Sequence, residues 1–341
     1  MCAVMNDSSL SISAKSTPAD LTTPWSSHPV LDPETQQFLD LAAEAGLHPD
    51  RLLIERPTFP ECRDLDDRSG DPTPVSVEHH ALRTDTGTVD VHIVRPLGVQ
   101  EPLPAVVYFP GGGWRMASYT THRRLVCRLA VEAGVAVAFV AYSSAADVRY
   151  PVQNEQAYAA LQYLVRNDKA LRIDSRAMAV AGDGAGGNMA AVTALLARDR
   201  SGPALRLQVL ICPILSANPT TRSYRQYSSG PGMTAHALEA FIDAQFPAES
   251  LSDKTAMPIL ARADELEDLP SALVITAEND VSRDDAEEYA RNLMRAGVKV
   301  NAVRYLGTIH DFVVFDGLAE TIPTDAALRH ACSVIKCVLH A

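Results

Sequence analysis

Hydrophobic and polar residues follow two recurring patterns along most of this chain. Continuous apolar runs at 104–109 (PAVVYF) and 135–142 (VAVAFVAY) are typical of strands that are covered on both faces. Between them, HRRLVCRLAVEAG has helical spacing and ends at Gly134. Strands that alternate with helices predict an α/β fold with a doubly wound, mainly parallel sheet.

The same alternation continues to the C-terminus. We expect helices at QNEQAYAALQYLVRN, NMAAVTALLARD, DDAEEYARNLMRAG and DAALRHACSVIKCVL, and strands at AMAVAG, LRLQVLICPIL, SALVITAE and VKVNAVRYLG. Upstream, VSVEHHALRT and VDVHIVRP flank an Asp-Thr-Gly turn signal at 85–87, which indicates an antiparallel pair.

The N-terminal part of the chain has a different character. Residues 1–30 are rich in Ser, Thr and Pro and predict a disordered or loosely held extension. Asp32 and Pro33 are a cap and a first-turn residue for a helix over 32–46. Residues 50–74 are polar and proline-rich, which predicts a loop.

One long stretch interrupts the alternation of strands and helices. Residues 216–268 are irregular, with one clear helix near TAHALEAFIDAQF. So long an excursion between two sheet strands usually forms a cap over a site. We therefore expect one α/β domain over 31–341, with cap contributions from 31–60 and 216–268.

Charge and cysteine usage narrow the function classes. The formal net charge is −12 and no basic block occurs, which argues against nucleic acid and anionic membranes as partners. No run of about 18 apolar residues predicts a membrane span, and the N-terminus lacks the pattern of a secretory signal. The cysteines lie far apart without zinc-ligand spacing, so we expect free thiols in a reducing cytoplasm, and neither a metal nor a cofactor.

Three glycine-rich or polar segments follow predicted strands and indicate a catalytic site. The first is the corner Gly182-Asp183-Gly184-Ala185-Gly186, which matches the G-x-S-x-G nucleophile elbow except at its centre. The second is YFPGGGW over 108–114, whose glycines could present backbone N–H donors to an oxyanion. The third is a late pair of acid and histidine, ITAEND and LGTIHDF. Elbow, acid and histidine then follow in α/β-hydrolase order.

These segments give the chain a family resemblance over roughly residues 75–340. It resembles the hormone-sensitive-lipase-like branch of the α/β-hydrolase fold, the bacterial acetyl-esterase and carboxylesterase type. That family shows HGGGW, DYRLAPE-like text, GDSAGGN, a late D-x-x-x-D segment and HGF or HDF, where this chain reads PGGGW, AYSSAAD, GDGAGGN, DVSRD and HDF.

The resemblance implies a role for each matching residue. The acid would be Asp280 and the base His310. The oxyanion hole would be formed by the N–H groups of Gly111, Gly112 and Ala185. It also implies a small-molecule substrate, and relatives that often dimerise suggest a possible homodimer.

The departures from the family pattern concern the chemistry itself. Gly184 stands at the position of the nucleophilic serine, so no acyl-enzyme can form there. Pro110 stands where the family has a histidine. Ala141 and the Ser143-Ser144 segment stand where the family has acidic and arginine residues.

Four interpretations therefore remain open. One is a diverged enzyme in which His310, oriented by Asp280, moves protons in an elimination, cyclisation, isomerisation or decarboxylation. The second is a silent relative that binds a ligand or partner. The third is a carboxylesterase whose serine was replaced deliberately. The fourth is a hydrolase that uses water or a relocated nucleophile, for which Ser143, Ser144 and Cys212 are the candidates.

Several other residues have two possible roles each. Asp183 could orient the elbow or stabilise the helix start. Trp114 could line the pocket or pack in the core, and Tyr142 could hydrogen-bond near the site or only pack. We assign Trp114, Tyr142 and Asp183 as substrate-binding residues. His122 and His236 are expected on the surface or the cap.

Overall fold

The computed structural model describes residues 29–47, 74–115 and 118–341. Within these ranges the strands form one eight-stranded sheet in the order β1-β2-β4-β3-β5-β6-β7-β8. β1 pairs antiparallel with β2, and β2 antiparallel with β4, while all later neighbours are parallel. The strands are β1 Val75–Thr84, β2 Gly87–Pro96, β3 Leu103–Phe109, β4 Ala136–Ala141, β5 Ile173–Asp183, β6 Leu207–Ile211, β7 Ser271–Asn279 and β8 Val300–Ile309.

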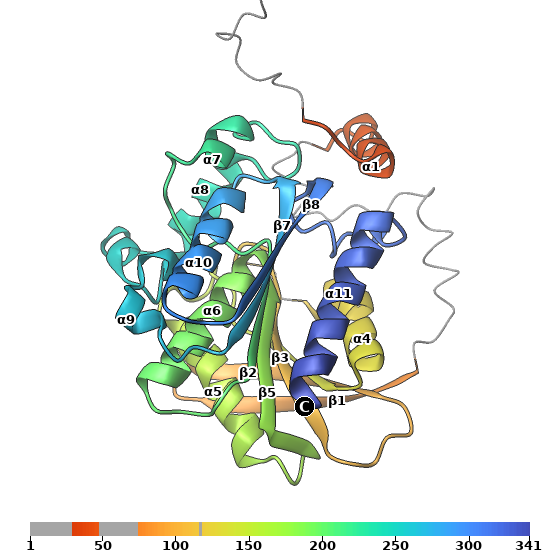
Figure 1. Ribbon diagram of the computed structural model, residues 1–341, viewed down its shortest axis with the longest axis vertical. Coiled ribbons are helices and arrows are strands. Elements are labelled where there is room, and N and C mark those ends of the chain that lie inside the picture. The colour runs from red at the N-terminus through yellow and green to blue at the C-terminus, as the bar shows by residue number, and fades with distance from the viewer. Residues whose placement is uncertain (1–28, 48–73, 116–117) are drawn as a thin grey trace, which may run out of the picture.

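Helices cover both faces of this sheet (Figure 1). α4 and α11 pack together on one face, and α5, α6 and α10 lie on the other. The main helices are α4 Tyr119–Ala133, α5 Val152–Arg166, α6 Gly184–Asp199, α10 Arg283–Arg295 and α11 Ile322–Leu339. The prediction of an α/β fold with a doubly wound, mainly parallel sheet is confirmed.

Two predicted boundaries near the site were wrong. α6 begins at Gly184 and not at Asn188, because the chain turns from strand to helix at a single residue with φ +49°. β6 ends at Ile211, although apolar residues continue to Leu215, because Cys212 takes a left-handed φ of 44° that ends the strand.

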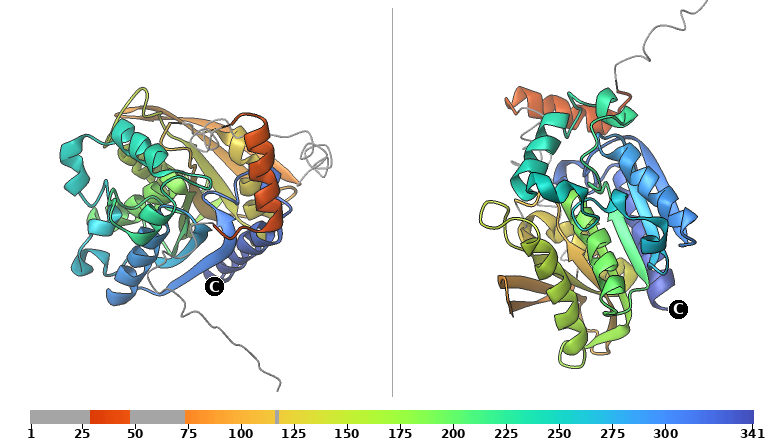
Figure 2. Two further views of the ribbon diagram at one scale, coloured as in Figure 1. Left: turned by 90° about the horizontal axis from the view of Figure 1, so that it is seen from above. Right: turned by 90° about the vertical axis from the view of Figure 1, so that its left-hand side faces the viewer.

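The N-terminal helix forms where its capping signals predict. α1 spans Pro33–Glu44, and the carboxylate of Asp32 accepts hydrogen bonds from the backbone N–H groups of Glu34 and Thr35. Phe38 is buried and its ring lies 5.3 Å from that of Phe315. The helix is thereby fixed to the segment after β8, near the carboxyl ends of the strands (Figure 2). The extension predicted over residues 1–30 and the loop predicted over 50–74 lie almost wholly outside the described residues.

The excursion between β6 and β7 is more structured than its sequence pattern predicts. Besides the expected helix, α8 Ala235–Gln245, it contains the short helices α7 Arg222–Gln226 and α9 Ala263–Leu266 and the 3-10 turns η1 Ala248–Ser252 and η2 Pro258–Leu260. Elements of three to five residues carry too little periodicity to be read from sequence.

Specific contacts attach this excursion to the sheet edge that carries the site. The ring of Phe241 in α8 packs so closely on Gly113 that a Cβ there would lie 2.3 Å from it. The guanidinium of Arg149 donates to backbone carbonyls of Asp243, Ala244 and Phe246. The position of this segment agrees with the cap that we expect, and its function as a cap stays a prediction.

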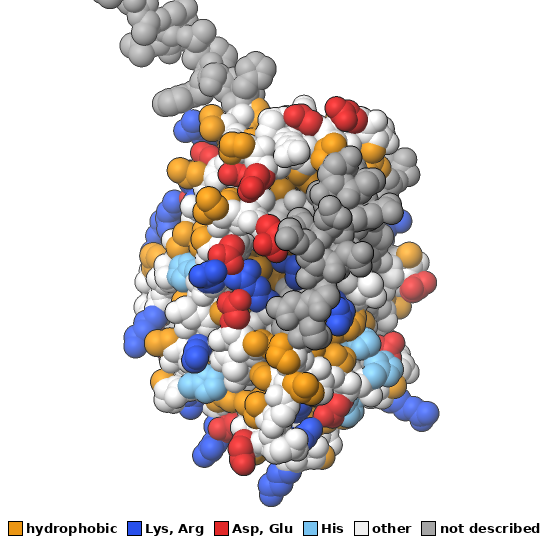
Figure 3. Space-filling model, turned by 90° about the vertical axis from the view of Figure 1, so that its right-hand side faces the viewer, with side chains coloured by type: hydrophobic (Ala, Val, Ile, Leu, Met, Phe, Trp, Pro, Cys, Tyr) orange, Lys and Arg blue, Asp and Glu red, His pale blue; other side chains and the backbone are white. Residues whose placement is uncertain are grey.

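The surface carries both signs of charge. On the face drawn in Figure 3, acidic and basic side chains are interspersed with hydrophobic ones. Within the described residues, no helix is both long and apolar enough to cross a membrane.

Candidate active site

The glycine-rich corner forms a tight strand-to-helix turn. β5 ends at Asp183 and α6 begins at Gly184, with no residue between them. A Cβ on Gly186 would lie 1.9 Å from the carbonyl oxygen of Phe109, so only glycine allows α6 to approach β3 this closely. The corner thus has the strand–turn–helix geometry that the elbow motif requires.

The acid and the histidine come together across two neighbouring strands. Asp280 directly follows β7 and His310 directly follows β8, and these parallel strands are paired in the sheet. His310 Nδ1 donates a hydrogen bond of 2.7 Å to Asp280 Oδ2. Both side chains are almost fully buried. The pair is therefore oriented, and the other ring nitrogen, Nε2, is left for chemistry.

That second nitrogen faces the elbow. A Cβ placed on Gly184 would lie 3.2 Å from His310 Nε2. A hydroxyl at this position would be within hydrogen-bonding reach of the ring, as in a Ser-His-Asp triad. The elbow, the acid and the histidine thus meet at one point, where Gly184 has no side chain.

Asp183 does not cap the helix that it precedes. Its side chain makes no capping hydrogen bond to α6. Instead, Tyr108 Oη donates to Asp183 Oδ1 at 2.6 Å, and His122 Nε2 lies 3.3 Å from Oδ2. All of these side chains are buried, so Asp183 anchors the elbow to β3 and α4 from behind. Its predicted role in orienting the elbow agrees with this geometry, and its role in substrate binding stays a prediction.

The loop after β3 adjoins the corner. A Cβ on Gly111 would lie 2.2 Å from Asp183 Oδ2, so the loop and the elbow are in direct contact. Gly112 has a φ of 104°, a conformation that favours glycine. Ala185 is in the first turn of α6, where backbone N–H groups have no partner within the helix. This is the setting for the predicted oxyanion hole.

Two predicted substrate-binding residues have well-defined structural contacts. Trp114 is fully buried, with a left-handed φ of 59°, and its ring meets that of Phe246 edge-on at 5.0 Å. Tyr142 Oη donates to the carbonyl oxygen of Pro110 at 2.7 Å. Tyr142 thus supports the loop after β3, while Trp114 joins that loop to the segment after α8.

Three carboxylates, of Asp280, Asp311 and Asp183, act on the imidazole of His310. Burial lowers the pKa of His310, but the charges of Asp280 and Asp311 outweigh this effect and raise the pKa to about 9, with a smaller contribution from Asp183. His310 is therefore an imidazolium at neutral pH in this structure. Its first role in a reaction would be to donate a proton.

The raised pKa of His310 predicts a pH dependence of stability. The pKa of an unfolded histidine is 6.5, so the imidazolium stabilises the fold fully below about pH 6.5. This contribution, ~3 kcal/mol from the size of the shift, is lost as the pH rises through about 9. The free energy of unfolding, measured in urea between about pH 6 and about pH 10, should fall by this amount more in the unmodified protein than in His310→Gln. Parallel curves of stability against pH for the two proteins would contradict this prediction.

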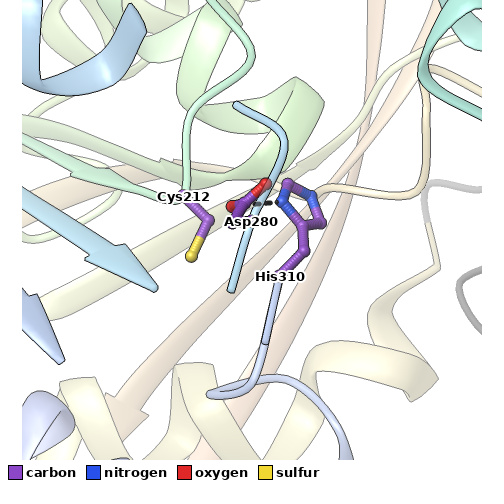
Figure 4. A group of neighbouring side chains, drawn as sticks. All are labelled: Cys212, Asp280 and His310. Carbon is purple, nitrogen blue, oxygen red and sulfur yellow. Dashed lines mark hydrogen bonds and ion pairs between the residues drawn. The ribbon is translucent and has the colours of Figure 1, made fainter. Parts of the chain in front are cut away.

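Cys212 lies behind the acid and not beside the histidine. One ligand atom each of Cys212, Asp280 and His310 lies within 4.8 Å of the others. Figure 4 shows the sulfur on the far side of Asp280 from the imidazole. Because the direct hydrogen bond between Asp280 and His310 accounts for this grouping, we assign no metal to it. Burial, followed by the charges of Asp280 and Asp311, raises the pKa of the thiol well above its usual value, which disfavours the nucleophilic thiolate.

The two candidate serines are held by other groups. Gln156 donates from Nε2 to Ser143 Oγ at 2.8 Å and accepts from the Ser143 backbone N–H. Ser144 Oγ donates to the carbonyl oxygen of Arg115. Neither hydroxyl has a hydrogen bond to a histidine among the described residues, so the structure lends no support to a relocated serine.

For two residues near the site, the structure differs from what we expect from the sequence. His122 is buried against Asp183 and not on the surface as expected, whereas His236 is exposed on α8. Helical spacing could have placed His122 on the buried face of α4 with Leu125, Val126 and Leu129. Asp311 was overlooked, although it directly follows the histidine, and its carboxylate lies 3.6 Å from His310 Nε2.

Comparison with known proteins agrees with this fold. A family model described as alpha/beta hydrolase fold matches residues 106–314. A carboxylesterase of Mycobacterium tuberculosis is 32% identical over 325 residues, which cover 94% of this chain and all of that protein. An ethyl acetate hydrolase of Pseudomonas putida is 35% identical over 72% of this chain and 79% of its own length.

Solved structures give the same result. A thermostable esterase from Pseudomonas putida superposes with a TM-score of 0.83 and is 34% identical, with 92% of this chain and 98% of that one covered. An esterase from Pyrobaculum calidifontis superposes with a TM-score of 0.80 at 35% identity, covering 91% of this chain and the whole of that one.

Proposed function

Because the chain belongs to the alpha/beta hydrolase fold family and is similar to esterases throughout its sheet, we propose that it acts on a small acyl or carbonyl compound by acid–base chemistry, without an acyl-enzyme. The reaction would be an elimination, cyclisation or isomerisation rather than ester hydrolysis. This assignment departs from the activities of the relatives because of one residue, Gly184.

The observation that carries the proposal is the hydrogen bond between His310 and Asp280 beside a corner without a side chain. The bond of 2.7 Å is intact, and Nε2 is directed at the place where a nucleophile would be. An oriented histidine can transfer protons without a serine, and such a transfer contributes about 10²–10⁴-fold to a rate.

Each residue of the site would have one role. Asp280 holds the imidazole of His310, which exchanges a proton with the substrate. The backbone N–H groups of Gly111, Gly112 and Ala185 would bind the carbonyl oxygen and stabilise an enolate or alkoxide. Trp114, Tyr142 and Asp183 would shape and support the substrate site.

The proposal is tested first on the unmodified protein. Incubation with a fluorophosphonate should give no covalent adduct by mass spectrometry, and p-nitrophenyl acetate should show no burst, because both reactions need a nucleophilic serine. The N-acetylcysteamine thioester of 3-hydroxybutyrate should lose its α-proton to D2O, as NMR can measure. A covalent adduct, or hydrolysis of the ester with a burst, would overturn the proposal.

A second candidate is a carboxylesterase that lost its activity with the serine, by design or as a natural non-catalytic binding protein. Two relatives named above, a carboxylesterase and an ethyl acetate hydrolase, favour it. It predicts no proton exchange in the unmodified protein, whereas the acid–base proposal predicts exchange.

Further expectations follow from the sequence. We expect a biosynthetic role in the cytoplasm, since the chemistry is non-hydrolytic and the cysteines Cys127, Cys212, Cys332 and Cys337 are all free thiols. A homodimer, which the family resemblance suggests, could use the edge strand β8 or the last helix, α11.

A further inference from the structure

The residue after the catalytic histidine occupies the space beside the missing nucleophile. The two carboxylate oxygens of Asp311 would lie 3.2 and 3.4 Å from a Cβ on Gly184. Oδ1 of the same group lies 3.6 Å from His310 Nε2. The carboxylate is thus next to both the empty corner and the reactive nitrogen, as a serine hydroxyl would be.

The backbone holds this carboxylate in place. Asp311 has a left-handed φ of 55°, which is unusual for a residue other than glycine and which aspartate tolerates better than most. Its carbonyl oxygen accepts a hydrogen bond from Val314, which closes a turn after β8. The residue is 1% exposed. Such a conformation at a candidate site suggests a functional constraint.

We infer that Asp311 is a catalytic residue, whose carboxylate replaces the serine hydroxyl as the partner of His310 Nε2 and takes the proton from the substrate. This inference rests on the proposed acid–base function and names the second group that the reaction needs. The first group, His310, is then the proton donor.

The electrostatics of the site agree with this division. Asp280 faces the Nδ1 side of the imidazole, Asp311 the Nε2 side, and Asp183 lies further behind the elbow. These charges keep the ring protonated, with the neutral thiol of Cys212 beyond Asp280. The carboxylate of Asp311 can then act as the base and the imidazolium of His310 as the acid on one substrate.

An elimination then balances without any other reactant. Asp311 takes the proton from the carbon next to the carbonyl, and the C–H electron pair becomes the new carbon–carbon double bond. The bond to the β-oxygen breaks, and that oxygen takes the Nε2 proton of His310 and leaves as water. Proton transfer from Asp311 to the neutral imidazole restores the starting state.

The same pair would open 5-nitrobenzisoxazole, a chromogenic carbon acid that reacts by a single proton abstraction. We expect Asp311→Asn and Asp311→Gly to lower kcat at least about 100-fold with little change in KM. Asparagine and glycine both tolerate a left-handed backbone, so either variant can keep the fold. Asp316→Asn is the matched control, because this carboxylate is on the same segment but pairs with Arg124 at 3.0 Å; it should react like the unmodified protein.

Two readouts separate catalysis from support of the fold. Formate should restore part of the activity of Asp311→Gly, about tenfold, because it can enter the space of the lost carboxylate. The pKa of His310, followed by NMR, should fall in Asp311→Asn and stay unchanged in Asp316→Asn.

The outcomes distinguish this inference from the proposed function. If His310→Gln loses the reaction while both Asp311 variants keep it, the role of Asp311 is refuted and acid–base catalysis by His310 stands. If the unmodified protein opens the probe no faster than a double variant that lacks both groups, His310→Gln with Asp311→Gly, the proposed function fails and the inference with it. Loss of rate without formate rescue and without a shift in the pKa of His310 would also overturn the inference.

Discussion

Gly184→Ser should create an esterase. The new hydroxyl would project toward His310 Nε2, since the Cβ position is 3.2 Å from that nitrogen, and α6 and the loop after β3 already adjoin the corner. Loss of a triad serine lowers kcat by about 10⁶-fold in a well-studied protease, so even partial recovery should raise kcat/KM for p-nitrophenyl acetate at least about 10³-fold. A spectrophotometric assay with burst analysis measures this gain.

Gly184→Ala is the control for that experiment. It adds the same Cβ in the same backbone conformation, with φ +49°, but no hydroxyl. Both variants should lose about 1 kcal/mol of stability to the left-handed backbone. Only the serine variant should hydrolyse the ester, and its rate should rise with pH because the imidazole must first lose its proton. Equal activity of the two variants would mean that the corner no longer supports a nucleophile.

His310→Gln should remove proton transfer from the unmodified site. Glutamine can keep a hydrogen bond to Asp280 but cannot exchange a proton. Loss of water from the 3-hydroxybutyryl thioester should therefore fall by about 10²–10⁴-fold in kcat. NMR of the α-position, at matched protein concentrations, measures the rate.

His236→Gln is the appropriate comparison. This histidine is exposed on α8 in the segment that we expect to form the cap, whereas Asp280 and His310 are buried. Its substitution should leave the loss of water unchanged. A His310→Gln variant that eliminates water as fast as His236→Gln would refute acid–base catalysis by His310.

Most of the fold could be predicted from the sequence, because the apolar runs and turn signals that indicate strands and helices are local. Continuous apolar runs predicted β3 and β4, and the turn signal at 85–87 predicted the pairing of β1 with β2. Boundaries at the elbow and at the end of β6 were wrong because single left-handed residues, Gly184 and Cys212, set them. The small helices of the excursion, α7 and α9, pack against α10 and are too short to show a periodicity of their own.

The sequence alone determined that a glycine stands at the centre of the elbow motif, and that an acid and a histidine follow in hydrolase order. Chemical identity and chain order do not depend on folding, so these statements need no coordinates. Only the tertiary structure decided which groups meet: the pairing of β7 with β8 brings Asp280 to His310, and a turn after β8 brings Asp311 to the empty corner. It also decided the charge of His310, because burial and three nearby carboxylates set that pKa, and their distances arise only when separate strands end at one edge of the sheet.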